Sequence, residues 1–108
     1  MLTGKNKERF ESYYLNLPNS MGLNYGNRQT TLNKFYSLPL SMQFGVYVDY
    51  ADSIGYEIST FGKEINGFIE WAVANKNNSK VEVGAEKTRD ESRKAAIKAF
   101  DEIVNSAT

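Results

Sequence analysis

The chain of 108 residues contains neither cysteine nor histidine. Their absence excludes thiol nucleophiles, disulfides, imidazole general bases and the usual zinc sites in one step. Catalysis would have to depend on carboxylates, hydroxyls and lysines, yet no phosphate-binding loop, serine nucleophile elbow or dinucleotide fingerprint is present. We therefore expect a protein that is not an enzyme and that needs no cofactor.

The chain also lacks long apolar runs and an excess of charge of either sign. No apolar run approaches the length of a transmembrane helix, and the charged start of the chain has no signal-peptide pattern. We therefore expect a cytoplasmic protein without membrane contact. The thirteen basic and thirteen acidic side chains cancel, which argues against both a strongly basic nucleic-acid-binding protein and an acidic DNA mimic.

Apolar and aromatic side chains are plentiful. They make up 41% and 13% of the chain respectively, enough for one modest core without a disulfide or metal. The length suits one core and not two. The composition therefore predicts a single folded domain over residues 1–108.

The first third of the chain reads as helical. Thr3 can cap a helix that continues to about Leu17, where Pro18 ends it. Phe10, Tyr14 and Leu17 follow each other at helical spacing and form its expected buried stripe. This pattern predicts an amphipathic first helix.

A second helix is predicted after an irregular segment. Residues 20–30 are rich in glycine and asparagine, which favours a loop, and residues 31–36 suit a short turn or helix. Ser37 followed by Pro39 is typical of a helix start, and we expect that helix to reach about Ile54. Its expected inner side contains Leu40, Phe44, Val48 and Ala51. Residues 45–48 also favour a β-strand, so a strand remains the alternative there.

Three short segments then alternate between apolar and other side chains. They lie near residues 56–59, 68–73 and 80–84, and turn-rich residues separate them. This spacing predicts an antiparallel three-stranded meander. Ile69, Trp71 and Val73 would share one face of the sheet, and that face needs a cover.

The last helix supplies the cover. Thr88 and Glu91 form a capping box at its start. Its expected inward stripe contains Ala96, Phe100 and Ile103, flanked by Ala99 and Val104. We therefore predict an α+β fold with N-terminal helices, a three-stranded antiparallel sheet, and a C-terminal helix packed on the sheet.

Basic residues gather at the start and along one flank of this last helix. They are Lys87, Arg89, Arg93, Lys94 and Lys98. A helix start with basic side chains could receive a phosphate, including one of RNA. Asp90, Glu91 and Glu102 stand three or four residues from these cations, so ordinary ion pairs on an exposed helix are the alternative.

Two further sets of residues could form sites. Tyrosines combine apolar area with a polar tip, and Tyr25, Tyr47 and Tyr50 are the candidates for contact with a partner. Asp49 and Asp52 would share a helix face, but two carboxylates are too few for a metal site. We therefore predict a partner-binding surface and no metal.

Two resemblances suggest a class of function. The order helix, three strands and helix resembles the double-stranded-RNA-binding domain, with residues 87–96 at the position of its RNA-contacting helix start. Asp90 and Glu91 stand there where that family has positive charge. The segments 1–5, 37–55 and 88–103 are similar to small proteins of bacterial phages and prophages.

The phage resemblance implies a function through binding. That class of small proteins includes anti-CRISPR proteins, which bind an RNA-guided nuclease or its guide RNA. It implies an accessory protein in the host bacterial cytoplasm that inhibits a ribonucleoprotein by stoichiometric binding. A direct RNA-binding module and a small structural or regulatory phage protein are the alternatives.

Overall fold

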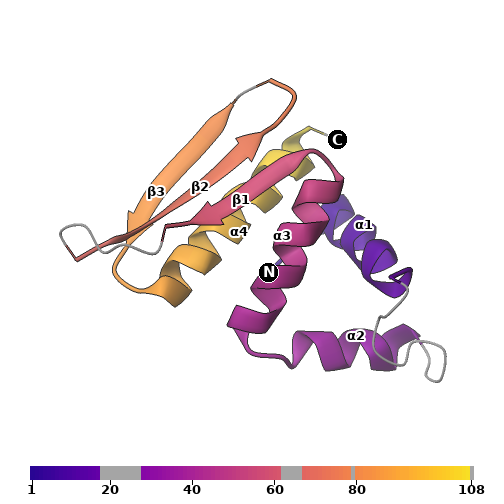
Figure 1. Cartoon of the computed structure of the whole chain (residues 1–108). Helices are drawn as coiled ribbons and strands as arrows, with labels where there is room; N and C mark the ends of the chain where they lie inside the picture. Colours follow the sequence, from indigo (N-terminus) through magenta and orange to yellow (C-terminus); the bar gives the residue numbers. More distant parts are fainter. Residues whose placement is uncertain (18–27, 62–66, 79, 108) are drawn as a thin grey trace.

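The computed structural model describes residues 1–17, 28–61, 67–78 and 80–107. In these residues three helices precede a three-stranded antiparallel sheet, and a fourth helix packs on that sheet (Figure 1), so the predicted α+β fold is confirmed. The elements are α1 (Gly4–Leu15), α2 (Arg28–Tyr36), α3 (Leu40–Ser53), β1 (Tyr56–Thr60), β2 (Ile69–Asn75), β3 (Val81–Glu86) and α4 (Arg89–Ser106).

The sheet is the predicted meander. Its strands lie in the order β1-β2-β3, with Ile58 opposite Val73 and Trp71 opposite Gly84. Paired residues of an antiparallel sheet share a face. Ile58, Trp71 and Val73 are buried on the side that α4 covers, and Ser92 of α4 donates a hydrogen bond of 2.6 Å to the carbonyl of Ile69.

The predicted start of α4 is present. The Thr88 hydroxyl accepts a hydrogen bond of 3.1 Å from the Glu91 amide. Of the predicted inward residues, Ala96, Ala99, Phe100 and Val104 are buried, and Ile103 is half-buried. Strong local signals, a cap and a helical apolar stripe, were therefore enough to place this helix.

The first helix differs from the prediction at both ends. Thr3 occupies the N-cap position, but its hydroxyl donates to Asp101 of α4 over 2.6 Å and does not cap α1. The helix ends at Leu15, and Leu17 is only half-buried. The proposed stop at Pro18 lies outside the described residues. A long-range partner therefore replaces the local cap.

The second and third helices also correct the prediction. Helix α2 starts at Arg28, so residues 28–30 of the segment that was expected to be a loop are helical, and residues 20–27 lie outside the described part of the chain. Ser37 does not cap α3, because its hydroxyl donates to the carbonyl of Lys34 and α3 begins at Leu40. Residues 45–48 are helical, so the alternative of a strand there is wrong.

The buried side of α3 is offset from the predicted one. Its buried residues are Gln43, Tyr47, Tyr50 and Ala51, whereas Leu40, Phe44 and Val48 are half-buried. The tyrosines can enter the core because their hydroxyls find acceptors there. Tyr47 donates to Gln43 over 3.0 Å, and Tyr50 donates to the side-chain oxygen of Asn6 over 2.8 Å.

The Trp71 indole of β2 packs closely against the backbone of Gly84 in β3, and a substitution at Gly84 tests this packing. A Cβ atom on Gly84 would lie 2.5 Å from three atoms of the buried Trp71 indole, so Gly84→Ala should lower the free energy of unfolding by about 2 kcal/mol. Gly45→Ala is the matched control. Gly45 is exposed on α3, and nothing lies within 4 Å of the new methyl group. Because alanine favours a helix more than glycine does, the free energy of unfolding should rise by about 0.5–1 kcal/mol. Urea unfolding followed by tryptophan fluorescence measures both, and equal effects would contradict this packing.

Candidate functional site

The predicted partner-binding tyrosines are not on the surface. Tyr47 and Tyr50 are 0% and 1% exposed, so the prediction that they contact a partner is wrong for this fold. Burial, followed by the charge of Glu11, raises the pKa of Tyr47 to about 12. Its hydroxyl therefore stays protonated and serves as a core hydrogen-bond donor. Tyr25 lies outside the described residues.

The predicted basic residues separate into three sets. Arg93 forms an ion pair with Asp90 over 3.1 Å, and its guanidinium lies 5.8 Å from the centre of the Phe44 ring. It therefore has the ordinary structural role that was the alternative. Lys87 and Arg89 are exposed where α4 begins. Lys94 and Lys98 lie elsewhere, in a groove.

This groove, hereafter the lysine groove, lies where α4 meets the N-terminal residues and the start of α3. Its volume is about 680 Å³. Lys7, Lys94 and Lys98 contribute its positive charge. The apolar part of its wall includes Met1, Leu2, Leu40 and Ile97. Cations beside apolar walls suit an anionic group attached to a flat or apolar one, such as a nucleotide.

The lysines of the groove have no carboxylate partner among the described residues. The ion pairs formed there are Arg93 with Asp90 and Lys76 with Asp52. The expected pairing of Lys94 and Lys98 with acidic neighbours on α4 is therefore not formed. Lys7 instead lies 5.8 Å from the centre of the Tyr36 ring. The three ammonium groups are available to an external anion.

Lys7 is a candidate residue that the sequence did not identify. It stands in α1, far along the chain from the basic residues of α4, and no spacing or motif connects them. Thr3 and Asn6 bring α1 against α4 through hydrogen bonds of 2.6 Å and 2.9 Å to Asp101. Long-range contacts such as these bring Lys7 to the groove.

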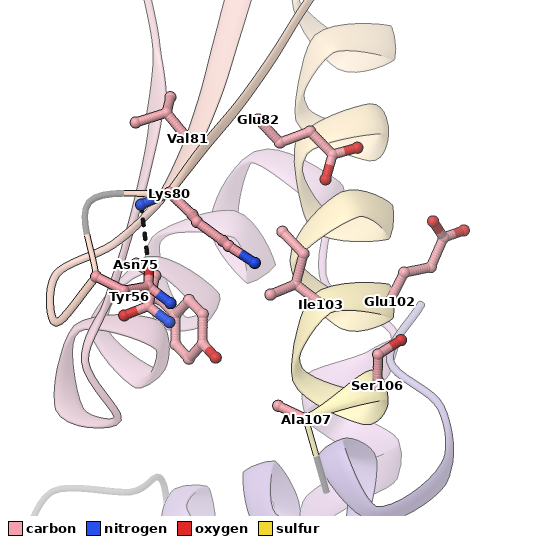
Figure 2. A pocket seen from close by; sticks show the side chains of 10 residues that line it. Tyr56, Asn75, Lys80, Val81, Glu82, Glu102, Ile103, Ser106 and Ala107 are labelled. Atoms are coloured by element: carbon pink, nitrogen blue, oxygen red, sulfur yellow. Dashed lines mark hydrogen bonds between the residues drawn. The ribbon is translucent and has the colours of Figure 1, made fainter.

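A second hollow lies between β3 and the C-terminal half of α4. Its volume is about 640 Å³, and Tyr56, Lys80, Glu82 and Ile103 are among its lining residues. Figure 2 shows the side chain of Lys80, the residue before β3, extending toward Ile103, with Glu82 above it. Charges of both signs meet there, so this hollow does not select an anion as the lysine groove does.

The described residues offer no site for a metal made of three or more acidic side chains. Asp52, one of the two aspartates considered above, forms an ion pair with Lys76, and Asp49 is exposed. No helix in the described part of the chain is both long and apolar enough to cross a membrane.

The face of the sheet opposite α4 is an exposed apolar surface. In Figure 1 the helices lie on the other side of the sheet. Phe61, Phe68, Val81 and Val83 are 48%, 40%, 61% and 68% exposed, and alternation places them all on this face. Exposed apolar faces of this kind are typical of interaction surfaces.

Comparison of the chain with family models, with curated proteins and with solved structures finds no match. Function is therefore inferred from the lysine groove and the exposed faces themselves.

Proposed function

We propose that this protein acts by stoichiometric binding, as a phage-type inhibitor of an RNA-guided nuclease in the bacterial cytoplasm. The lysine groove is its contact with the guide RNA of that ribonucleoprotein. The observation that carries the proposal is the meeting of Lys7, Lys94 and Lys98 beside apolar walls, without carboxylate partners among the described residues. Phosphate contacts from lysine supply most of the affinity of such complexes.

Binding fits the side chains better than catalysis does. The chain has no thiol or imidazole, and the tyrosine hydroxyls nearest the groove are committed to structure. Tyr36 donates to Glu11 over 2.7 Å, and burial and this hydrogen bond raise its pKa. A hydroxyl that holds its proton this strongly is a poor nucleophile.

A charge reversal in the groove tests the proposal. The Lys94→Glu/Lys98→Glu variant should bind the guide-loaded nuclease at least about tenfold more weakly and lose inhibition of target cleavage by the same factor. The Lys5→Glu/Lys34→Glu variant changes net charge equally at exposed positions outside the groove and should inhibit as the unaltered chain does. Equal inhibition by both variants would place the contact elsewhere. A panel of guide-loaded nucleases that shows neither complex formation nor loss of cleavage would reject the inhibitor function.

A direct RNA-binding module is the second candidate, because the same groove could hold free RNA. Salt titration with protein-free single-stranded RNA distinguishes the two. If Lys94 and Lys98 each contact a phosphate, the slope of log affinity against log salt should become shallower by roughly 1.4 in the double variant. Binding to the ribonucleoprotein with no binding to free RNA at low salt supports the inhibitor.

A further inference from the structure

Strand β3 is one of the two edge strands of the sheet, and helix α3 contacts the other, β1. Among the described residues β3 pairs with β2 alone, and Figure 1 shows β3 on the side of the sheet away from α1, α2 and α3. Natural proteins protect such edges with prolines, lysines or bulges, because free backbone groups recruit another strand. Residues 81–86 contain neither proline nor lysine, and their pairing with β2 is uninterrupted.

The register shows which backbone groups face the open edge. The Asn75 amide donates to the carbonyl of Lys80 over 2.8 Å, so the backbone of Lys80 faces β2. Direction alternates along an antiparallel strand. The residues whose N–H and C=O groups point to the open edge are therefore Val81, Val83 and Ala85. The same three residues have their side chains on the exposed apolar face.

We propose that β3 pairs antiparallel with β3 of a second copy of this chain, with Val83 opposite Val83 on the two-fold axis. The pair would join two sheets of three strands into one continuous sheet. In this register Val81 lies opposite Ala85 of the second copy, and all outward backbone groups of both strands are paired. Three hydrogen-bonded residue pairs, each exchanging two bonds, give about six intermolecular hydrogen bonds.

The charges of β3 and of Lys80, the residue before it, favour a second copy of the chain in this register. A two-fold axis perpendicular to the sheet keeps matching faces together, so the register can shift only in steps of two residues. With Val83 on the axis, Lys80 lies opposite Glu86 of the second copy, twice over. A shift in one direction places Glu82 opposite Glu82, and a shift in the other places Glu82 opposite Glu86. The charges of the strand thus complement a second copy of the same strand in one register. Pairing with an unrelated strand would not require this self-complementary pattern.

The dimer would also extend the exposed apolar surface. The valines and alanine of the two copies would lie side by side across the new strand pair, where cross-strand contacts between β-branched side chains add stability. Val81 and Val83 are 61% and 68% exposed in the single chain, so this contact covers side chains that intrachain packing leaves in water.

A proline at position 83, on the two-fold axis, distinguishes this dimer from dimers formed through other surfaces. Because the Val83 amide faces away from β2, Val83→Pro removes an intermolecular donor and leaves the intrachain ladder intact. Sedimentation equilibrium should show a dimer for the unaltered chain and dissociation roughly 10- to 100-fold easier for Val83→Pro. Val83→Thr keeps the amide and the branched side chain and should remain a dimer. A chain that stays monomeric up to about 1 mM, or a Val83→Pro variant that dimerises as before, would overturn the proposal.

Charge reversal tests the register itself. Lys80→Glu and Glu86→Lys should each weaken self-association, because like charges then meet across the strand pair. Mixing the two variants restores both opposite-charge pairs, so a heterodimer should form in excess of either homodimer. Trp71 donates to Glu86 over 3.4 Å, so tryptophan fluorescence must first confirm that each variant keeps the native fold. A mixture without preferential heterodimer would contradict the register with Val83 on the axis.

Discussion

Replacing Asp101 with alanine should lower the free energy of unfolding by about 3–5 kcal/mol, because several donors would lose their acceptor at once. Asp101 is only 5% exposed. Its carboxylate accepts from the Thr3 amide at 3.1 Å, the Thr3 hydroxyl at 2.6 Å and the Asn6 side chain at 2.9 Å. Asn6 is fully buried, so water cannot replace the lost bond there.

The same carboxylate connects three helices. Asn6 lies between Asp101 and Tyr50, accepting from the tyrosine hydroxyl over 2.8 Å while donating to the carboxylate. Asn105 adds a hydrogen bond of 3.0 Å to the carbonyl of Thr3. Because this network holds α1 against α4, it also places Lys7 in the groove that Lys94 lines. Loss of Asp101 should therefore weaken the lysine groove as well as the fold.

Glu102→Ala is the control for this effect. Glu102 is the adjacent acidic residue and is exposed, so its removal should change stability by less than about 0.5 kcal/mol. Urea unfolding followed by tryptophan fluorescence measures both variants. If Asp101→Ala and Glu102→Ala cost the same, the buried network would not hold α1 in place.

The C-terminal half of this chain was predictable because its signals are local. The Thr88 cap lies three residues from its partner Glu91, and the alternation in β2 spans only a few residues. Such short-range patterns survive in any tertiary context that buries one face. The sheet order and the cover by α4 followed from them.

The N-terminal half was less predictable because several of its buried polar groups, among them the Tyr50 hydroxyl and the Asn6 side chain, find their partners at long range. Hydrophobicity alone placed Leu40 and Phe44 inside and left Tyr50 available to a partner. Tyr50 is buried because Asn6, 44 positions earlier in the chain, accepts its hydrogen bond. No residue spacing shows such a contact. For the same reason the sequence identified Lys94 and Lys98 but not Lys7, so two of the three cations of the groove were foreseen.

Replacing Phe10 with alanine should cost about 3–5 kcal/mol, because it removes the ring at the centre of the aromatic core. Phe10 is fully buried, and its ring centre lies 4.9 Å from that of Tyr47 and 5.3 Å from those of Phe35 and Tyr50. These neighbours belong to α2 and α3, so they cannot collapse into the cavity without moving whole helices. The cavity should therefore stay largely open.

A loss of this size approaches the whole stability of a small domain, about 5–15 kcal/mol. Phe10→Leu keeps most of the apolar volume and should cost clearly less, so it gives a measurable value if Phe10→Ala does not fold. Phe61→Ala removes the same ring from the exposed face, where Phe61 is 48% exposed, and should change stability by less than about 1 kcal/mol. Calorimetric unfolding ranks the three variants. Equal losses at Phe10 and Phe61 would mean that the core of α1, α2 and α3 is not packed around Phe10.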